Sequence, residues 1–202
     1  MHGLIGRALE TFIADAHGDA LRGEALSRAG LPPDGFASAR RFSSASGSLL
    51  LRAASAATGL PSAALLTDLG IWLVSQRRNE PIRRLVRFGG GDFHGFLHSL
   101  EDLPARGRLA MPDLDLPRIM LIDRAPSYDI RTEFPQWGAG HVLSGVLRGM
   151  ADDYGVLAVV EHAGGHRVRG GPCAERIRVE VADDAHTDGR RFDLVPSLLH
   201  AA

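Results

Sequence analysis

The spacing of apolar residues along the chain changes once, at Pro117. Before it, apolar side chains recur every three or four positions, which is the period of a helix with one buried face. Glycine and proline punctuate these segments and indicate where helices end and begin. The predicted helices cover residues 1–16, 20–29, 49–58, 61–73 and 82–88, and a central helix starts at residue 93. A short helix and a loop are expected over residues 35–47, leading to a serine cap near Ser46.

Beyond Pro117 the apolar residues alternate in short runs, as in strands with one buried face. The predicted strands cover residues 119–122, 128–134, 156–161 and 177–181. A longer segment with helical periodicity, residues 138–154, separates the second strand from the third. The sequence therefore predicts an α+β fold, in which an N-terminal helical part precedes a four-stranded antiparallel sheet with one long inserted helix.

The stretch from Phe93 to Pro117 organises the rest of the chain. Phe93, Leu97, Leu100 and position 104 fall on one helical face, so a buried pocket or core is expected opposite position 104. The run F-L-x-x-L-x-x-L followed by M-P-x-L-x-x-P is carried by Phe96, Leu97, Leu100, Leu103, Met111, Pro112, Leu114 and Pro117. This combination resembles the haem nitric oxide/oxygen binding family, known as H-NOX or HNOB.

Further segments carry the same resemblance. The opening M-x-G-L-I is similar to the H-NOX N-terminus, where the isoleucine at the Ile5 position presses on the porphyrin; an ordinary core position explains Ile5 equally well. Residues 53–73 contain A-A-S, L-G, L-L and G-x-W, and residues 138–151 end in G-V-L-x-G-M-A. The resemblance covers residues 1–182 and implies one domain, with a helical half to about residue 117, a sheet half over 118–182 and a tail over 183–202.

Two devices that anchor haem in that family are absent from this chain. In H-NOX domains the residue after the last leucine of the central helix is the histidine that ligates the iron, and here it is Pro104. A Y-x-S-x-R set on the second strand binds the propionates, and the corresponding residues are Thr132, Phe134 and Gln136. None of them supplies the bidentate positive charge of arginine. The resemblance thus implies a divergent member with a degenerate haem site, whose expected pocket lining is Ile5, Leu97, Leu100, Leu103, Pro104, Pro112, Thr132, Phe134 and Gln136.

Pro104 also predicts an early end to the central helix, because proline lacks an amide proton and disfavours helical geometry at the preceding residue. A haem-sized hole beside it would be costly to leave empty. Leu97, Leu100, Leu103, Ile5 and Phe134 are therefore expected to collapse into one apolar cluster. Arg131, next to the Thr132 position, is expected on the opposite face of the strand.

His98 and His94 are the histidines closest in sequence to the lost ligand, and His141 is a weaker candidate. The preferred interpretation places His98 and His94 at the surface or rim, with substitution for the iron ligand as the alternative.

Three other groups of residues have two interpretations each. His162, His166 and Cys173 flank a Gly-rich hairpin loop that could mimic a zinc site, although a solvated turn is preferred and no metal is expected. Asp113 and Asp115 are interpreted as solvated loop carboxylates rather than a catalytic pair. The glycines of residues 89–91 are predicted to form a flexible hinge rather than a phosphate cradle.

Composition narrows the range of partners and locations. The chain has 202 residues, 45% of them hydrophobic, and a formal net charge of −1, which suits one full core. All its side-chain cations apart from histidine are arginine, and no basic face stands out, so no nucleic-acid partner is expected. Cys173 is the single cysteine, which excludes an internal disulfide. No apolar run of signal or membrane-spanning length is apparent, so a cytoplasmic location without membrane contact is expected.

Two functions agree with these observations. The first is a non-enzymatic signalling or regulatory domain that needs no cofactor and acts through a protein partner, which by family resemblance is a histidine kinase, a cyclic-dinucleotide enzyme or a cyclase. The alternative is a sensor of gas, such as nitric oxide, or of redox state, which binds haem or another tetrapyrrole with changed ligation. No constellation of catalytic residues supports an enzyme.

Overall fold

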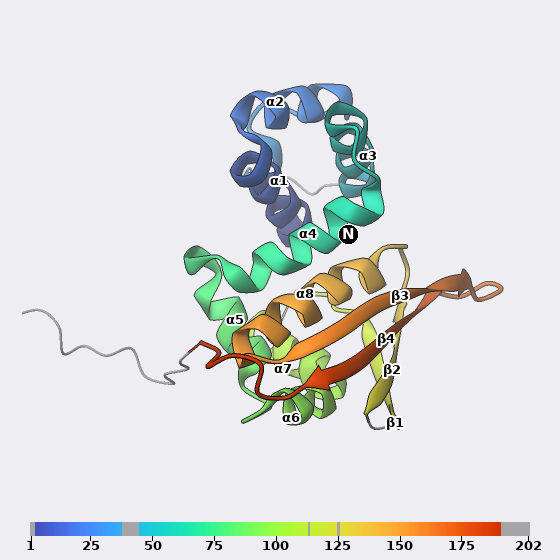
Figure 1. Cartoon of the computed structure of the whole chain (residues 1–202). Helices are drawn as coiled ribbons and strands as arrows, with labels where there is room; N and C mark the ends of the chain where they lie inside the picture. The colour runs from blue at the N-terminus through green and yellow to red at the C-terminus, as the bar shows by residue number, and fades with distance from the viewer. Residues whose placement is uncertain (1–2, 38–44, 113, 125, 191–202) are drawn as a thin grey trace, which may run out of the picture.

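The structure, a computed structural model, describes residues 3–37, 45–112, 114–124 and 126–190. Its N-terminal helices form a separate layer above the sheet (Figure 1). They are α1 (Gly3–His17), α2 (Asp19–Arg28), the 3-10 turn η1 (Gly35–Ala37), α3 (Ser46–Thr58) and α4 (Ser62–Ser75). Helix α3 ends at Gly59, whose φ of 73° is left-handed, as the sequence predicted. The predicted serine cap is wrong, because Ser46 lies inside α3 and Ala45 is its N-cap.

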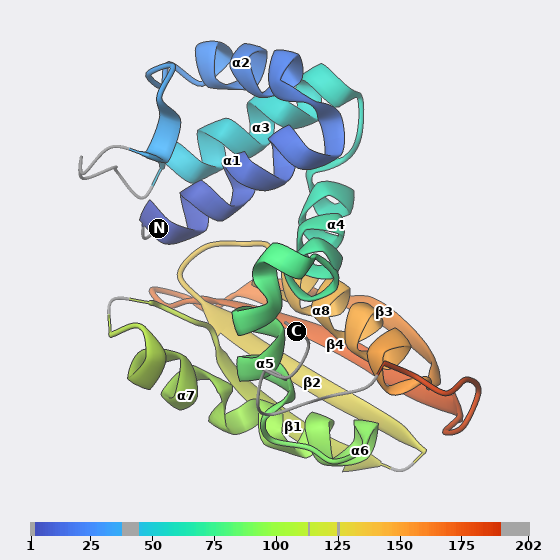
Figure 2. The same ribbon diagram turned by 90° about the vertical axis from the view of Figure 1, so that its left-hand side faces the viewer.

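A second group of helices lies beside the sheet (Figure 2). It consists of η2 (Arg77–Asn79), α5 (Glu80–Arg87), α6 (Phe93–His98), η3 (Ser99–Asp102) and α7 (Leu103–Ala110). The central helix ends early, at His98, and a 3-10 turn follows it, as the proline predicted. The expectation of non-helical geometry at Leu103 is wrong, because Leu103 has φ −55° and ψ −41° and begins the separate helix α7. Pro104 lies in the first turn of α7, where a missing amide proton costs no hydrogen bond.

The sheet is four-stranded and antiparallel in the order β1-β2-β4-β3, as the alternating pattern predicted. Its strands are β1 (Arg118–Arg124), β2 (Ser127–Phe134), β3 (Leu157–Arg167) and β4 (Cys173–Asp183). Helix α8 (Ala139–Tyr154) lies between β2 and β3 in sequence and packs across the sheet (Figure 1). The sheet face covered by α8 is apolar except for Thr132 and Glu175, whereas Arg131, Arg176 and Arg178 are exposed. Arg131 thus lies on the predicted side.

The described residues form two apolar cores. The first lies within α1–α4 and contains Phe12, Leu50, Leu65 and Trp72. The second lies between the sheet, α8 and helices α5–α7, and it contains Phe96 together with the buried faces of the strands. The change of secondary structure at Pro117 therefore does not separate the cores, which instead divide along α4.

Helices α4 and α8 cross at a pair of glycines that join the two cores. A Cβ atom on Gly145 would overlap the carbonyl oxygen of Thr67, and one on Gly70 would overlap the carbonyl oxygen of Val142. These contacts are between backbones, so only glycine allows the helices to approach so closely. The crossing fixes the position of α8, and therefore the positions of the side chains at both ends of that helix.

Among the described residues, no single helix has the length and apolar character to cross a membrane, although α3 and α4 together pass that test as a pair bent by 105°.

Candidate functional site

Three of the residues expected around position 104 lie in the sheet core. Leu97, Leu100 and Leu103 are buried there, and Pro104 is buried in the first turn of α7. Position 104 is therefore interior, as the spacing predicted, but a proline ring offers no atom that can ligate iron. Pro112, which follows α7, is exposed.

The three positions of the propionate motif carry no positive charge. Thr132 is fully buried on β2, opposite Ile119 and Glu175, and its hydroxyl has no hydrogen-bond partner among the described residues. Phe134 ends β2 and is half-buried, and Gln136 is half-buried in the turn before α8. These side chains cannot form the salt bridges that an arginine forms with carboxylates.

The predicted apolar collapse is wrong. Leu97, Leu100 and Leu103 belong to the sheet core, whereas Ile5 and Phe134 belong to neither of the two cores and are only half-buried. The reason is the arrangement of the helical half, which is joined to the rest mainly where α4 packs on α8. That joint holds α1 within the upper layer (Figure 2).

The contacts of His94 and His98 are with β1, β2 and Asp184, which follows β4. The His94 Nδ1 atom lies 2.5 Å from the Tyr128 hydroxyl, and its Nε2 atom lies 2.8 Å from Asp184. The His98 Nε2 atom lies 3.2 Å from a carboxylate oxygen of Asp123, and its side chain is exposed. Both imidazoles thus have partners away from the buried face of α6 and α7, in agreement with the surface interpretation.

The histidines and cysteine of the β3–β4 hairpin do not form one site. Cys173 is buried, with its Sγ atom 3.8 Å from the Pro135 carbonyl oxygen, and His166 is exposed. His162 instead lies with His141 and Glu175, and ligand atoms of these three residues are all within 4.8 Å of one another. They are the one such group of three or more histidine, cysteine or acidic residues within the described part of the chain.

Sequence reasoning missed Glu175, although a signal for it exists. Along β4 the residues Cys173, Ile177 and Val179 are buried while Arg176 and Arg178 are exposed. Glu175 falls in the buried phase of this alternation, which is unusual for an ionisable side chain unless it has partners. His162 was assigned to the edge of a loop because the predicted strand ended at residue 161, whereas β3 continues to Arg167.

The cluster is built where three elements meet. His141 lies in the first turns of α8, His162 on β3 and Glu175 on β4. The amides of Gly138 and Gly140 donate to one carboxylate oxygen of Glu175 at 3.0 and 3.2 Å, and the other oxygen lies 3.0 Å from His162 Nε2. The two imidazole rings stack with centroids 3.8 Å apart.

A cavity of about 330 Å³ opens beside this cluster. Its lining comes from both halves of the molecule: Leu51, Ser62, Ala63, Leu66, Trp137, Gly138, His141, His162 and Glu175. Burial and the neighbouring His162 lower the pKa of His141, and Glu175 opposes that shift. The site therefore favours a neutral His141 imidazole next to a buried carboxylate.

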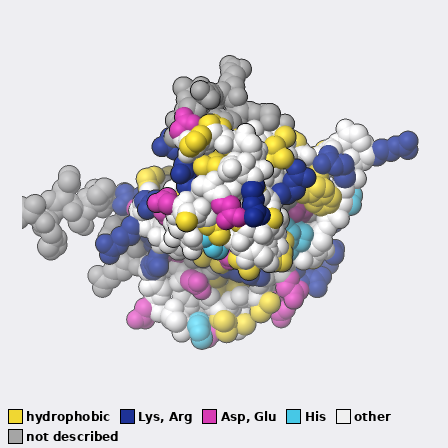
Figure 3. Space-filling view, turned by 90° about the horizontal axis from the view of Figure 1, so that it is seen from above, with side chains coloured by type: hydrophobic (Ala, Val, Ile, Leu, Met, Phe, Trp, Pro, Cys, Tyr) yellow, Lys and Arg dark blue, Asp and Glu magenta, His cyan; other side chains and the backbone are white. Residues whose placement is uncertain are grey.

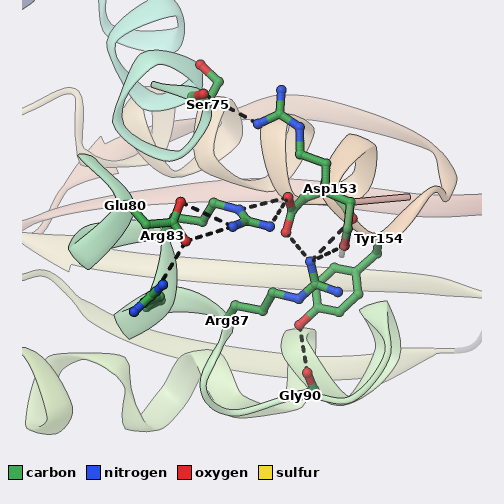
Figure 4. A network of polar contacts seen from close by, with 9 residues as sticks. Ser75, Glu80, Arg83, Arg87, Gly90, Asp153 and Tyr154 are labelled. Carbon is green, nitrogen blue, oxygen red and sulfur yellow. Dashed lines mark hydrogen bonds and ion pairs between the residues drawn. The ribbon is translucent and has the colours of Figure 1, made fainter. Parts of the chain in front are cut away.

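The other end of α8 carries a second polar cluster, of a different kind (Figure 4). Asp153 is only 4% exposed and faces two arginines from α5. Arg83 Nε donates to one of its carboxylate oxygens at 2.8 Å, and Arg87 Nη1 donates to the other at 2.5 Å. Glu80 binds Arg83 from the other side, at 3.0 Å. The charges of this cluster are paired directly, by side chains that α5 supplies.

Tyr154 extends this second cluster towards the glycines before α6. Arg87 lies over its ring, 4.3 Å from the centroid, and its hydroxyl donates to the Gly90 carbonyl oxygen at 2.8 Å (Figure 4). Burial raises the pKa of Tyr154 to about 12, with Asp153 and Asp92 adding to the shift and Arg87 opposing it. Gly89 and Gly90 pack against Ser99 and Phe96 too closely for a side chain, so they serve close contact rather than the predicted hinge.

Two loop carboxylates were predicted to be solvated rather than catalytic. Asp115 is exposed, and Asp113 lies outside the described residues.

Similarity to known proteins then decides the family. The haem-NO-binding family model, HNOB, matches residues 2–161. The chain belongs to the H-NOX family. H-NOX domains are haem-based gas sensors and signalling domains, which agrees with the resemblance seen in the central helix.

Solved H-NOX structures share the fold of this member at low sequence identity. An H-NOX mutant from T. tengcongensis has a TM-score of 0.74 at 14% identity, covering 92% of this chain and 100% of that one. A Cs H-NOX mutant with an unnatural amino acid has a TM-score of 0.75 at 14% identity, with 93% and 100% covered. An oxygen-binding H-NOX domain related to soluble guanylate cyclases reaches 0.70 at 14% identity, with 95% and 100% covered. No curated protein matches the chain in sequence.

Proposed function

We propose that this H-NOX domain has lost ordinary haem binding and regulates a protein partner. The observation that carries the proposal is the buried Pro104 at the position where the family has its iron ligand. Axial ligation by a side chain is set by position, because the ligand atom must stand over the iron at bonding distance. The proline ring fills apolar volume in the core and has no atom that can ligate a metal.

The second device for holding haem has changed as well. A buried pair of propionates needs positive charge or several hydrogen-bond donors. Thr132, Phe134 and Gln136 together offer one hydroxyl and one amide, and the Thr132 hydroxyl is fully buried between strands. The residues present therefore do not fit an ordinary haem group at either its iron or its propionates.

The alternative sensor with changed ligation requires another ligand for the iron. His94 and His98 are the candidates from sequence, but their ring nitrogens lie beside Asp184, Tyr128 and Asp123. Releasing either ring would break these contacts. We therefore rank the haem or tetrapyrrole sensor below the haem-independent regulator.

The partner is expected to be a signalling protein, such as a histidine kinase or a cyclic-dinucleotide enzyme, because the family is a signalling family. The face formed by the N-terminal helices carries arginines in separate groups, interspersed with acidic and apolar side chains (Figure 3). Such a mixed surface favours a protein partner over nucleic acid. We expect the domain to act in the cytoplasm and without catalysis of its own.

The absorption spectrum of protein produced with haem supplied tests this function. We expect no stoichiometric Soret band and no ferrous nitrosyl spectrum after addition of nitric oxide. A one-to-one haem complex would contradict the proposal. In that case His98→Ala and His94→Ala variants, compared with the parent spectrum, identify the substitute ligand.

Restoring the ligand alone should not restore binding. In Pro104→His the imidazole returns, but Phe134 and Gln136 still leave the propionates without an arginine. We expect no five-coordinate haem spectrum, with Pro104→Ala as the control for removal of the proline ring. A haem spectrum from Pro104→His alone would show that the pocket had been preserved.

A further inference from the structure

The cluster of His141, His162 and Glu175 has the composition of a metal site. Two imidazole nitrogens and a carboxylate oxygen converge within 4.8 Å. The 3.0 Å between His162 Nε2 and Glu175 Oε1 is close to the separation of about 3.3 Å expected for two ligands of one tetrahedral zinc ion.

The backbone is shaped so that these side chains can meet. A Cβ atom on Gly140 would lie 2.9 Å from the Glu175 Cβ atom, closer than real Cβ atoms approach, and 3.0 Å from His162 Nε2, which is tighter than an ordinary contact. The Gly138 and Gly140 amides hold one oxygen of Glu175 and leave the other directed at His162. Hydrogen bonds of this kind orient ligating carboxylates in metal sites.

We propose that His141, His162 and Glu175 bind a divalent transition-metal ion, with zinc as the expected occupant and the fourth position open to the cavity. Imidazole nitrogens favour zinc and its neighbours over magnesium or calcium, which prefer oxygen ligands throughout. Two histidines and one glutamate with an open position form a known zinc ligand set. Because the cavity is lined by Leu51 and Leu66 as well, a ligand on the ion contacts the N-terminal helices.

Metal binding changes the tautomer of His162 in this arrangement. The Gly164 amide points at His162 Nδ1, at 3.4 Å, so in the metal-free state Nε2 carries the proton that is donated to Glu175. A metal ion on Nε2 takes the place of that proton, which moves to Nδ1, so the imidazole stays neutral. The Gly164 contact is at the long limit of hydrogen bonding, and Gly164 lies at an irregularity of the β3–β4 pairing, so the exchange of tautomer disturbs little.

Titration of the metal-free protein with Zn²⁺ tests the site, with Co²⁺ as a coloured probe of geometry. We expect one ion per chain, visible d–d bands typical of four-coordinate Co²⁺, and loss of about 100-fold or more in affinity in His162→Ala. His166→Ala is the matched control, because His166 is exposed on the same hairpin, and it should bind as the parent does. Equal binding by His162→Ala, or no binding by the parent, would overturn the proposal.

A second variant separates ligand loss from unfolding. In Glu175→Gln the side-chain oxygen still accepts from the two glycine amides, while the amide nitrogen that replaces the second oxygen cannot ligate. We expect a parent-like circular dichroism spectrum together with a loss of affinity of about 10-fold or more. Thermal unfolding gives the same comparison, since Zn²⁺ should raise the Tm of the parent and of His166→Ala only. A parent-like Zn²⁺ affinity in folded Glu175→Gln would remove the carboxylate from the site.

Discussion

The two ends of helix α8 each lie at a buried carboxylate, which is stabilised in a different way at each end. Each end faces a buried carboxylate: Glu175 at the N-terminus and Asp153 at the C-terminus. Glu175 receives two backbone amides, where the helix dipole already favours negative charge. Asp153 lies where the dipole disfavours it and is neutralised by Arg83 and Arg87.

The difference indicates which end is free to do something else. At the C-terminus every charged group is committed, because removing either partner leaves a buried charge unpaired. At the N-terminus the helix itself supports the carboxylate, so His141 and His162 are not needed to balance it. Their imidazoles adjoin a cavity of about 330 Å³ and remain available to a ligand. The closed end stabilises the fold, and the open end is the place for binding.

The largest expected effect is at the closed end. Asp153→Asn should destabilise the protein by about 3–5 kcal/mol, because Arg83 and Arg87 lose their shared counter-charge inside the molecule. Urea unfolding followed by circular dichroism measures the change. Asp152→Asn is the matched control, since Asp152 is the exposed neighbour, and it should shift stability by less than about 0.5 kcal/mol. A loss of stability below about 1 kcal/mol in Asp153→Asn would be no larger than that of an ordinary single mutation. It would show that the arginines reach solvent.

The next effect concerns the crossing that holds both ends in place. Gly145→Ala should destabilise by about 1–3 kcal/mol, because its Cβ overlaps the Thr67 carbonyl oxygen and backbone cannot swing aside. Gly23→Ala on α2 is the control, because nothing lies within 4 Å of its Cβ, and helix propensity should stabilise it by up to about 1 kcal/mol. The two substitutions should shift the urea midpoint in opposite directions. A stabilised Gly145→Ala would mean that α4 and α8 can separate.

At the open end, neutralising the carboxylate should cost less. Glu175→Gln in the presence of a chelator is expected to destabilise by about 1 kcal/mol, because the side-chain oxygen keeps the two amide hydrogen bonds. Glu180→Gln, exposed on the same strand, is the control. Urea unfolding under the conditions used for Asp153→Asn gives the direct comparison. Equal losses in the two variants would refute the distinction between a closed and an open end.

Much of this architecture could be predicted from the sequence. The period change at Pro117 gave the order of helices and strands, since buried faces impose their period locally. Two features escaped because they depend on distant residues. Leu103 was expected to leave helical geometry before Pro104, but after a 3-10 turn these two residues begin a separate helix. The expected collapse around Ile5 does not form, because Gly70 and Gly145 set where the helical half sits.

The candidate site was less predictable than the fold. Pro104, Thr132, Phe134 and Gln136 could be placed from the family pattern, but His141 and Glu175 are 34 positions apart and no local motif joins them. Glu175 was detectable only as an acidic residue in the buried phase of a strand. Both clusters on α8 arise from tertiary contacts between residues that look like ordinary surface positions in the sequence.

The smallest expected effect is at Tyr154, which closes the C-terminal cluster. At neutral pH, Tyr154→Phe should cost about 0.5–1 kcal/mol through the lost hydrogen bond to Gly90.

The pKa of Tyr154 in the folded protein is about 12, against an ordinary 10, so above pH 10 the unfolded chain releases the phenolic proton first. Stability supplied by this group is therefore complete below pH 10 and is lost as pH rises towards 12. Between about pH 9 and 11.5 the urea midpoint should fall less steeply with rising pH in Tyr154→Phe than in the parent, because phenylalanine has no phenolic proton to release. Tyr128, whose pKa burial also raises, supplies the remaining slope, and an unchanged slope in Tyr154→Phe would mean that the closed end admits water.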